Sequence, residues 1–567
     1  PALARHPDHP MLGALHASAA AAAHDGPETA ARLARFDQRF PGSALALLWT
    51  GRTLAEARQY DAGAEILRRA TDRAPFWGEP RLQLGLLLVQ AARDDEARRV
   101  LTRAVELDPF NARANNSIRL LDELAQYATI ESEHFVIRYE PGIDEALARE
   151  MPPVLESIHR RVCADVPGGM DHEPPRKTII EIMPSHAEFA VRIGGMPSIH
   201  TMAASTGPII AIEAPRAGPG MKAGPYDWAR VLQHEYTHTV NLSYTDNRVI
   251  HWMTEANAVY NEDAPRTHDQ WTLLARAYKA DDLFDLAEIN TAFVRPENPG
   301  DRSLAYAQGA WMFEYMIERF GPRAPRAIMR ASAEGRAAHD ALGDTLGVTP
   351  ESFGADFRAW AARDLRDRGL LAPDDAPALG DLLDTTRQGA PPGPETLDAL
   401  LEKHGDIPEL IALRAAQALR GAADRLTPQQ LDLVQRALAA RPEDPMPRKR
   451  LVRHLLAADD PADRARAIPH LEHLAAREIH TPAYHDQLAI LRARRADHEN
   501  ALAHARAATR IAPYDAPTRE QAARMAILAR NLDAARRHLS ALAILEPDRP
   551  IHARRLEALE TMMNEQQ

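Results

Sequence analysis

A repeated proline spacing constrains the fold of this chain more than any other feature of its sequence. Prolines occur at Pro7, Pro41, Pro75 and Pro109, and each step between them is 34 residues long. A fixed period of this length is typical of tetratricopeptide (TPR) repeats, in which pairs of antiparallel helices stack so that each pair buries the apolar face of its neighbour. The N-terminal part of the chain is therefore predicted to be an α-solenoid.

Small residues recur within each period, at positions where two helices must approach closely. In the third unit Gly85 occupies such a position in the first helix, and Ala97, Leu101 and Ala104 follow in the second helix. The second unit has Gly51 at the position that corresponds to Gly85. This agreement favours TPR units over an unspecific bundle of alanine-rich helices.

The same spacing returns near the C-terminus. Pro408 and Pro442 are 34 residues apart, and so are Pro513 and Pro547. The distance from Pro442 to Pro513 is 71 residues, slightly more than two periods of 34. We expect the extra residues to lie near 458–467, within a second array of the same kind.

Between the arrays the period disappears and the composition changes. Residues 134–141, 177–184 and 208–215 have the residue types of β-strands and are bounded by turn-forming residues. We expect the third of them, 208–215, to form an edge strand on which an extended peptide could pair. The central region is therefore predicted to be an α+β domain.

The predicted fold is mainly α-helical, with TPR arrays on both sides of this central domain. The segments are an N-terminal TPR array at 1–127, the central domain at 128–370, a linker at 371–394, and a C-terminal TPR array at 395–567 that ends in a capping helix at 550–563. The chain starts at Pro1 within what resembles the end of a helix, so we expect the first array to be truncated. Localisation is therefore left open, with a periplasmic or secreted protein slightly favoured over a cytoplasmic one.

Charge, hydropathy and cysteine content exclude several classes of function. The formal net charge is -12 and no basic stripe is present, so we expect no nucleic-acid partner. No apolar run approaches the length of a membrane span, which needs about 18 residues or more. The single cysteine, Cys163, excludes an intramolecular disulfide and a thiolate-rich zinc site.

Residues 234–238 read His-Glu-Tyr-Thr-His, an HExxH motif, in a segment that Asp227 can cap as a helix. In a helix His234 and His238 lie on one face, so both imidazoles can reach a single metal ion, usually zinc. Glu235 lies beside the first histidine, where it could take a proton from a metal-bound water. The chain has 24 histidines, and the motif arises by chance in about one sequence in ten of this kind.

A third ligand would raise the specificity of the motif, because catalytic zinc keeps three protein ligands and one open position. Glu255 follows His238 by 17 residues and lies near the start of a segment with helical composition. We prefer Glu255 because Trp252 would anchor the start of that helix in the core. Glu262 is the competing ligand, and Glu255 could instead be a solvated glutamate that the helix dipole favours.

Several segments resemble the TPR-associated zinc peptidases of the gluzincin group, often labelled peptidase MA-like. The resembling segments are 131–142, 181–192, 207–220, 228–242, 247–263 and 305–321. The resemblance implies that His234 and His238 bind Zn²⁺ and that Glu255 is the third ligand. It also implies that Glu235 is the general base. The sequence departs from the family at Ala256, where a glycine usually follows the third ligand.

The resemblance implies a zinc-dependent peptidase that hydrolyses protein or peptide substrates and uses its TPR grooves to dock a substrate or a protein partner. Tyr306 resembles the tyrosine of the family in a later helix and would donate to the oxyanion, although a core tyrosine is an equal alternative. His251, Tyr244 and His186 also lie near the motif in sequence, and we interpret them as structural. The alternative function is an inactive, peptidase-like TPR scaffold for protein–protein interaction.

Overall fold

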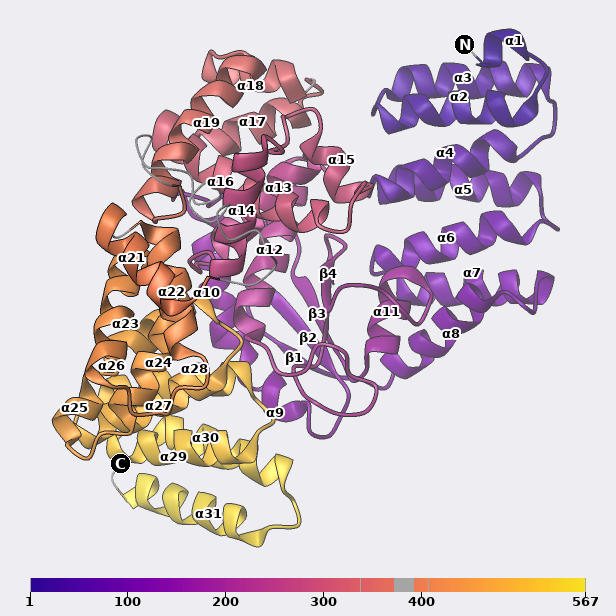
Figure 1. Ribbon diagram of the computed structural model, residues 1–567. Helices are drawn as coiled ribbons and strands as arrows, with labels where there is room; N and C mark the ends of the chain where they lie inside the picture. Colours follow the sequence, from indigo (N-terminus) through magenta and orange to yellow (C-terminus); the bar gives the residue numbers. More distant parts are fainter. Residues whose placement is uncertain (1, 337, 372–391, 406, 566–567) are drawn as a thin grey trace. The chain divides into compact units, whose positions relative to one another are not determined.

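The computed structural model describes residues 2–336, 338–371, 392–405 and 407–565. Helices dominate these residues, and one small sheet lies in the central region (Figure 1). The predicted linker at 371–394 lies outside the described residues except at its ends. The predicted fold class, a mainly helical protein with solenoid arrays around an α+β region, is confirmed. Among the described helices, none is both long enough and apolar enough to cross a membrane.

The N-terminal array consists of helix pairs, as the proline period predicts. Its helices are α1 (Ala2–Arg5), α2 (Pro10–Ala22), α3 (Gly26–Arg39), α4 (Leu45–Glu56), α5 (Tyr60–Arg73), α6 (Gly78–Gln90), α7 (Asp94–Leu107) and α8 (Ala112–Leu124). A Cβ atom on Gly85 would lie 2.4 Å from the side chain of Leu101, and one on Gly51 would lie 2.6 Å from that of Leu67. Glycine is therefore required where the two helices of a pair cross.

The sheet has five strands in the order β1-β2-β3-β5-β4. The strands are β1 (Ala128–Glu131), β2 (Phe135–Tyr139), β3 (Thr178–Met183), β4 (Ala203–Ser205) and β5 (Ile209–Glu213). The strands β2, β3 and β5 are parallel, whereas β1 and β4 pair antiparallel with their neighbours. The prediction that 208–215 forms an edge strand is wrong, because β5 lies between β3 and β4. Every residue of β5 is buried, which agrees with its continuous apolar sequence.

The short strand β4 forms that edge of the sheet, and residues of the N-terminal array cover its end. The main-chain oxygen of Ser205 accepts a hydrogen bond from Arg58 at 3.3 Å, and that of Thr206 accepts one from the Tyr60 hydroxyl at 2.7 Å. Ser205 itself is only 6% exposed. An extended peptide would therefore find this end of the edge already paired.

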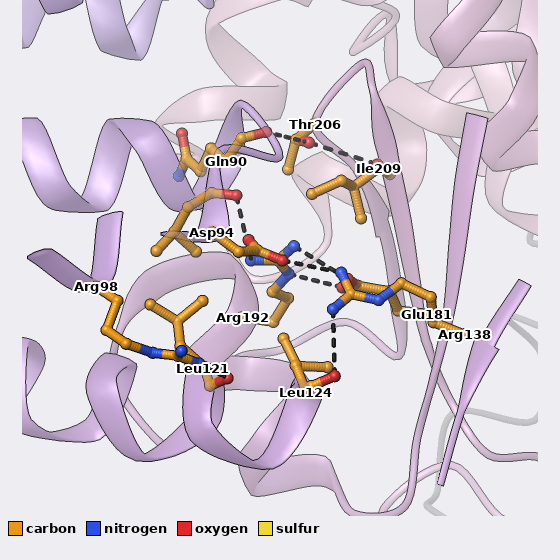
Figure 2. A network of polar contacts seen from close by, with 11 residues as sticks. Gln90, Asp94, Arg98, Leu121, Leu124, Arg138, Glu181, Arg192, Thr206 and Ile209 are labelled. Atoms are coloured by element: carbon orange, nitrogen blue, oxygen red, sulfur yellow. Dashed lines mark hydrogen bonds and ion pairs between the residues drawn. The ribbon is translucent and has the colours of Figure 1, made fainter. Parts of the chain in front are cut away.

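A buried ionic network joins the array to the sheet (Figure 2). Arg192 is 2% exposed and pairs with Glu181 of β3, which is fully buried, at 2.6 Å. Asp94, the first residue of α7, accepts from Arg192 at 3.0 Å and from Arg138 of β2 at 2.8 Å. Because such charges are costly to bury singly, each member of the network depends on the others.

The chain divides into two compact units. The first comprises residues 1–262, 322–341 and 544–547, and therefore holds the N-terminal array and the sheet together. Its further helices are α9 (Glu145–Ala148), α10 (Met151–Cys163), α11 (His186–Gly194), α12 (Trp228–Tyr244), α13 (His251–Asn261) and α17 (Ala324–Ala333). One apolar core runs through α6, α7 and α8 to Met183, Phe189 and Ala211 of the sheet region. The array is thus part of the same folded body as the sheet.

The second unit comprises residues 263–321, 342–543 and 548–567. Its helices are α14 (His268–Ala280), α15 (Ile289–Val294), α16 (Asp301–Phe320), α19 (Pro350–Asp367), α21 (Pro394–His404), α22 (Pro408–Leu419), α23 (Pro428–Ala440), α24 (Pro445–Leu456), α25 (Pro461–Ala465), α26 (Ile468–Arg477), α27 (Pro482–Arg494), α28 (His498–Ile511), α29 (Ala516–Leu528), α30 (Leu532–Leu545) and α31 (Pro550–Glu565). The short helix α25 lies within 458–467, where the extra residues of the period were expected. The helix α18 (Ala338–Leu346) and the end of α30 each cross a boundary between the units.

Candidate metal centre

The HExxH motif lies in the middle of α12, a helix with a well-defined start. The carboxylate of Asp227 caps this start and accepts from the main-chain nitrogens of Ala229 at 3.2 Å and Arg230 at 3.3 Å. Trp228 and Tyr236 are each 1% exposed, so apolar side chains hold the helix against the core. A capped and buried helix is a rigid support for a binding site.

The structure brings the two motif histidines together at their Nε2 atoms. These atoms of His234 and His238 are 3.1 Å apart, and the two ring planes meet at 78°. The histidine side chains keep 16% and 13% of their surface exposed, so solvent reaches the pair. Two imidazoles in this arrangement direct their lone pairs to one point.

Glu255 of α13, the predicted third ligand, lies beside both histidines. Its Oε2 atom lies 3.4 Å from Nε2 of His238 and 3.7 Å from Nε2 of His234. This oxygen is buried and, within the described part of the chain, has no hydrogen-bond partner of acceptable geometry. A cation among the three atoms would satisfy it, so the donor set of two imidazoles and one carboxylate fits zinc.

The charged side chains of this group shift the pKa values of one another. Burial alone would lower the pKa of His234, but the nearby carboxylates of Glu255 and Glu262 outweigh it and raise that pKa well above its usual value. Burial would raise the pKa of Glu255, yet His238 and His234 outweigh it and hold this pKa well below its usual range. The carboxylate therefore stays ionised and attracts positive charge to this point.

Thr254 of α13 and Glu262, the residue directly after this helix, contact the outer nitrogens of the histidines. His234 Nδ1 lies 2.8 Å from Glu262 Oε1, and His238 Nδ1 lies 2.9 Å from Thr254 Oγ1. The structure thus places Glu262, the competing ligand, on the opposite side of the His234 ring from Glu255. Such contacts orient metal-binding imidazoles and select their tautomer. The sequence alone did not reveal the role of Thr254, because it depends on how α12 and α13 cross.

Glu235, the expected general base, is 9% exposed in the same helix. Burial first, and then the charges of Glu213 and Glu235, raise the pKa of Tyr226 well above its usual value. Ala256, which replaces the glycine of the family, is 1% exposed within α13. Alanine therefore fits the helical backbone at this position.

The remaining residues named from the sequence lie in different surroundings. Tyr306 belongs to α16 of the second unit and packs edge-on against Phe293, with ring centroids 4.8 Å apart. Its role at the oxyanion stays a prediction. Tyr244 accepts from Arg330 at 2.9 Å, and His186 bonds to the carboxylate of Glu213 at 2.8 Å. His251 Nε2 lies 3.6 Å from Glu255 Oε1 and its side chain is 42% exposed, so it borders the predicted ligand set.

Two other groups of possible ligands share His134. One consists of His134, His159 and Glu173, and the other of Glu133, His134 and Glu156. The rings of His134 and His159 are stacked, with centroids 3.6 Å apart and only 14° between their planes. Because lone pairs of parallel rings do not converge, the first group is poorly shaped for a metal. In the second group, His134 Nδ1 already bonds to Glu156 at 2.7 Å.

Comparisons with known proteins find a similarity to one family over part of the chain. No curated protein matches it. Among solved structures, the Cut9-Hcn1 hetero-tetramer of the APC/C is 11% identical, with 96% of this chain and 95% of that chain covered and a TM-score of 0.22. Naa15/Naa10 bound to HypK-THB is 11% identical, with 91% and 65% covered and a TM-score of 0.17. Yeast Tom70 is 11% identical, with 92% and 96% covered and a TM-score of 0.16. TM-scores this low add nothing to the fold described above.

The match to a protein family is more informative. The family model described as the Peptidase MA superfamily matches residues 217–363. This region includes α12 and α13, and with them the histidines and Glu255. The segment that carries the HExxH motif is thus similar to the Peptidase MA superfamily.

Proposed function

We propose that this protein is a zinc-dependent peptidase that hydrolyses peptide bonds in protein or peptide substrates. The observation that carries the proposal is the convergence of His234 Nε2, His238 Nε2 and Glu255 Oε2. The match of the surrounding segment to the Peptidase MA superfamily supports it. Three protein ligands leave one position open, which is typical of catalytic zinc sites and not of structural ones.

In this proposal His234, His238 and Glu255 would hold Zn²⁺, which would act as a Lewis acid and lower the pKa of a water at the site towards neutrality. Glu235 accepts the proton of the attacking water and transfers it to the nitrogen of the leaving amine. Glu262 and Thr254 keep the two imidazoles in the tautomer that leaves Nε2 free. Tyr306 is the candidate donor to the oxyanion.

The helical arrays contribute recognition in this proposal. TPR-type solenoids offer extended surfaces that bind peptides or other proteins. The N-terminal array shares a core with the sheet, so a protein bound to it would lie on the same compact unit as α12. The proposed partners are therefore a protein or peptide substrate and a docking protein.

The proposal is tested by metal content and proteolysis together. We expect one Zn²⁺ per purified chain and cleavage of an unfolded substrate such as casein. Glu235→Gln should retain the zinc and lose cleavage. Stoichiometric zinc without any cleavage by the wild type, across a panel of unfolded proteins and peptides, would instead support the inactive scaffold.

A further inference from the structure

A chain of buried polar side chains leads through the interior to the outer nitrogen of His238. Asn241, Asn257 and Asn261 are all 0% exposed, although amides are costly to bury. Asn261 Nδ2 donates to Asn257 Oδ1 at 3.0 Å, and Asn257 Nδ2 donates to Asn241 Oδ1 at 2.9 Å. Asn241 Nδ2 then donates to Thr254 Oγ1 at 3.1 Å, and this hydroxyl lies 2.9 Å from His238 Nδ1. We call Asn261, Asn257, Asn241 and Thr254 the amide chain.

The direction of the amide chain is set at its far end by the main chain. Asn261 Nδ2 also faces the carbonyl oxygens of Gly168 at 2.9 Å and Asn257 at 3.0 Å. A carbonyl oxygen can only accept, so the nitrogen of the Asn261 amide must lie on this side. The orientations of Asn257 and Asn241 follow in the same way. The oxygen of each amide accepts from the nitrogen of the amide before it, so its own nitrogen must lie on the other side. Every amide therefore presents its N–H towards Thr254.

Gly168 permits this anchorage by its conformation and its size. Its φ is +78°, a region that side chains disfavour, and a Cβ atom there would lie 2.6 Å from the ring of Tyr260. The same Cβ would lie 3.3 Å from Nδ2 of Asn261. Only glycine lets the carbonyl of this residue approach the first amide without displacing the ring.

The two motif histidines differ in what faces their outer nitrogens. His234 faces the carboxylate of Glu262, which can only accept when ionised, so this contact alone places a proton on Nδ1 and leaves Nε2 free. His238 faces the hydroxyl of Thr254, which can either donate or accept. Its orientation therefore depends on how Thr254 itself is held.

We propose that the amide chain is a positioning device for the metal centre, in which Asn241 fixes the Thr254 hydroxyl as the acceptor of the His238 Nδ1 proton. A hydroxyl oxygen has two lone pairs, enough to accept from both Asn241 and His238. The Nε2 lone pair of His238 then points at the position of the metal. This inference rests on the proposed zinc site and assigns Thr254, Asn241, Asn257 and Asn261 as positioning residues.

The test is the zinc affinity of the purified full chain, measured by competition with a chromophoric chelator. Thr254→Val keeps the side-chain shape but removes the acceptor, and we expect about 10- to 100-fold weaker binding. Thr254→Ser should restore the affinity. Asn257→Leu and Gly168→Ala should weaken binding to a smaller extent, although neither residue contacts a ligand in this structure. The electronic spectrum of the Co²⁺-loaded protein should shift for the variants that lose affinity.

Thr50→Val is the matched control, because Thr50 is also 0% exposed and its hydroxyl has no partner among the described residues. Its zinc affinity should equal that of the wild type. Equal affinities for Thr254→Val and Thr50→Val, in variants whose metal-free forms melt as folded proteins, would overturn the inference. A wild type that binds zinc but cleaves nothing would contradict the proposed peptidase activity only. The zinc affinities of the variants would still decide whether the amide chain positions His238. A wild type that binds no zinc would overturn both.

Discussion

Two pairs of histidines lie in the first compact unit, and they differ chiefly in the angle between their rings. His234 and His238 meet at 78° with Nε2 atoms 3.1 Å apart, whereas the rings of His134 and His159 are nearly parallel at 14°. Both pairs have acidic side chains nearby, and both have an outer nitrogen bonded to a carboxylate. Residue types alone therefore do not separate a predicted metal site from a stacked pair. The direction of the lone pairs does.

The separation of the two histidines in the sequence explains the difference in the angle between their rings. The first pair is four residues apart in one helix, so both rings project from one face and converge. The second pair joins β2 and α10, because His134 immediately precedes the strand and His159 lies in the helix. There the rings stack as two flat groups, with the side chain of His134 half-buried. Histidines can thus be close without being arranged to share an ion.

The largest expected effect is on metal content. His238→Ala should remove the bound zinc, because two ligands in a solvent-accessible site hold zinc far more weakly than three. His134→Ala should retain one zinc per chain. Metal analysis of the two purified variants by mass spectrometry checks this. If the wild type holds two zinc ions and His134→Ala loses one of them, the stacked pair also binds metal and the proposed contrast between the two pairs is wrong.

The next effect is on catalysis. Glu235→Gln should lower kcat/KM by about 10²- to 10⁴-fold while zinc is retained, because the amide cannot accept a proton. Glu156→Gln makes the same chemical change beside the other pair, where Glu156 bonds to His134 at 2.7 Å. Its kcat/KM should match the wild type. A similar loss of kcat/KM in both variants would show that the stacked pair takes part in the reaction.

Several features of the site followed from the sequence because they are local. The i, i+4 spacing of the motif, the cap at Asp227 and the helical segment around Glu255 all depend on residues close in the chain. The role of the glycines in the helix pairs could also be predicted from the sequence, because the close approach of two helices excludes a side chain at Gly85.

Other features depend on contacts between residues far apart in the chain. The strand β4 has only three residues and no apolar alternation, so the sequence predicts the edge of the sheet at 208–215 instead. The bond between Arg192 and Asp94 joins residues 98 positions apart and makes the N-terminal array part of the central fold. The role of Thr254 at His238 depends on how two helices cross. No periodicity in the sequence encodes such pairings.

Tyr236 connects the two histidine pairs and offers a smaller test of their independence. It lies inside the motif, is 1% exposed, and its hydroxyl is 2.7 Å from Nδ1 of His159. Tyr236→Phe should lower the free energy of unfolding by about 0.5–1.5 kcal/mol, the usual value of one buried hydrogen bond. Denaturant unfolding measures this change. The zinc affinity should stay at the wild-type value, and a tenfold loss would show that the pairs are coupled.

The smallest effect is the pH dependence of stability at the stacked pair. Burial first, and then the nearby charge of His134, lower the pKa of His159, and Glu173 and Glu156 oppose this only partly. The Tyr236 hydroxyl and the Cys163 thiol, titratable groups of the described residues, also face its ring, and the thiol lies 3.6 Å from Nδ1. Burial raises the pKa of this thiol to about 11, so it stays neutral.

A lowered pKa in the folded protein means that the unfolded chain binds the proton of His159 first as the pH falls. The free energy of unfolding should therefore be independent of this group above the unfolded pKa, near 6.5, and should decrease below it. Replacing His159 by Gln should flatten this part of the curve between pH 7.5 and pH 5 in urea unfolding. Because His234 has a raised pKa, the converging pair should respond with the opposite sign in the metal-free protein. If the free energy of unfolding of His159→Gln depends on pH as steeply as that of the wild type, protonation of His159 does not destabilise the folded protein. The contrast between the two pairs would then depend on ring geometry alone.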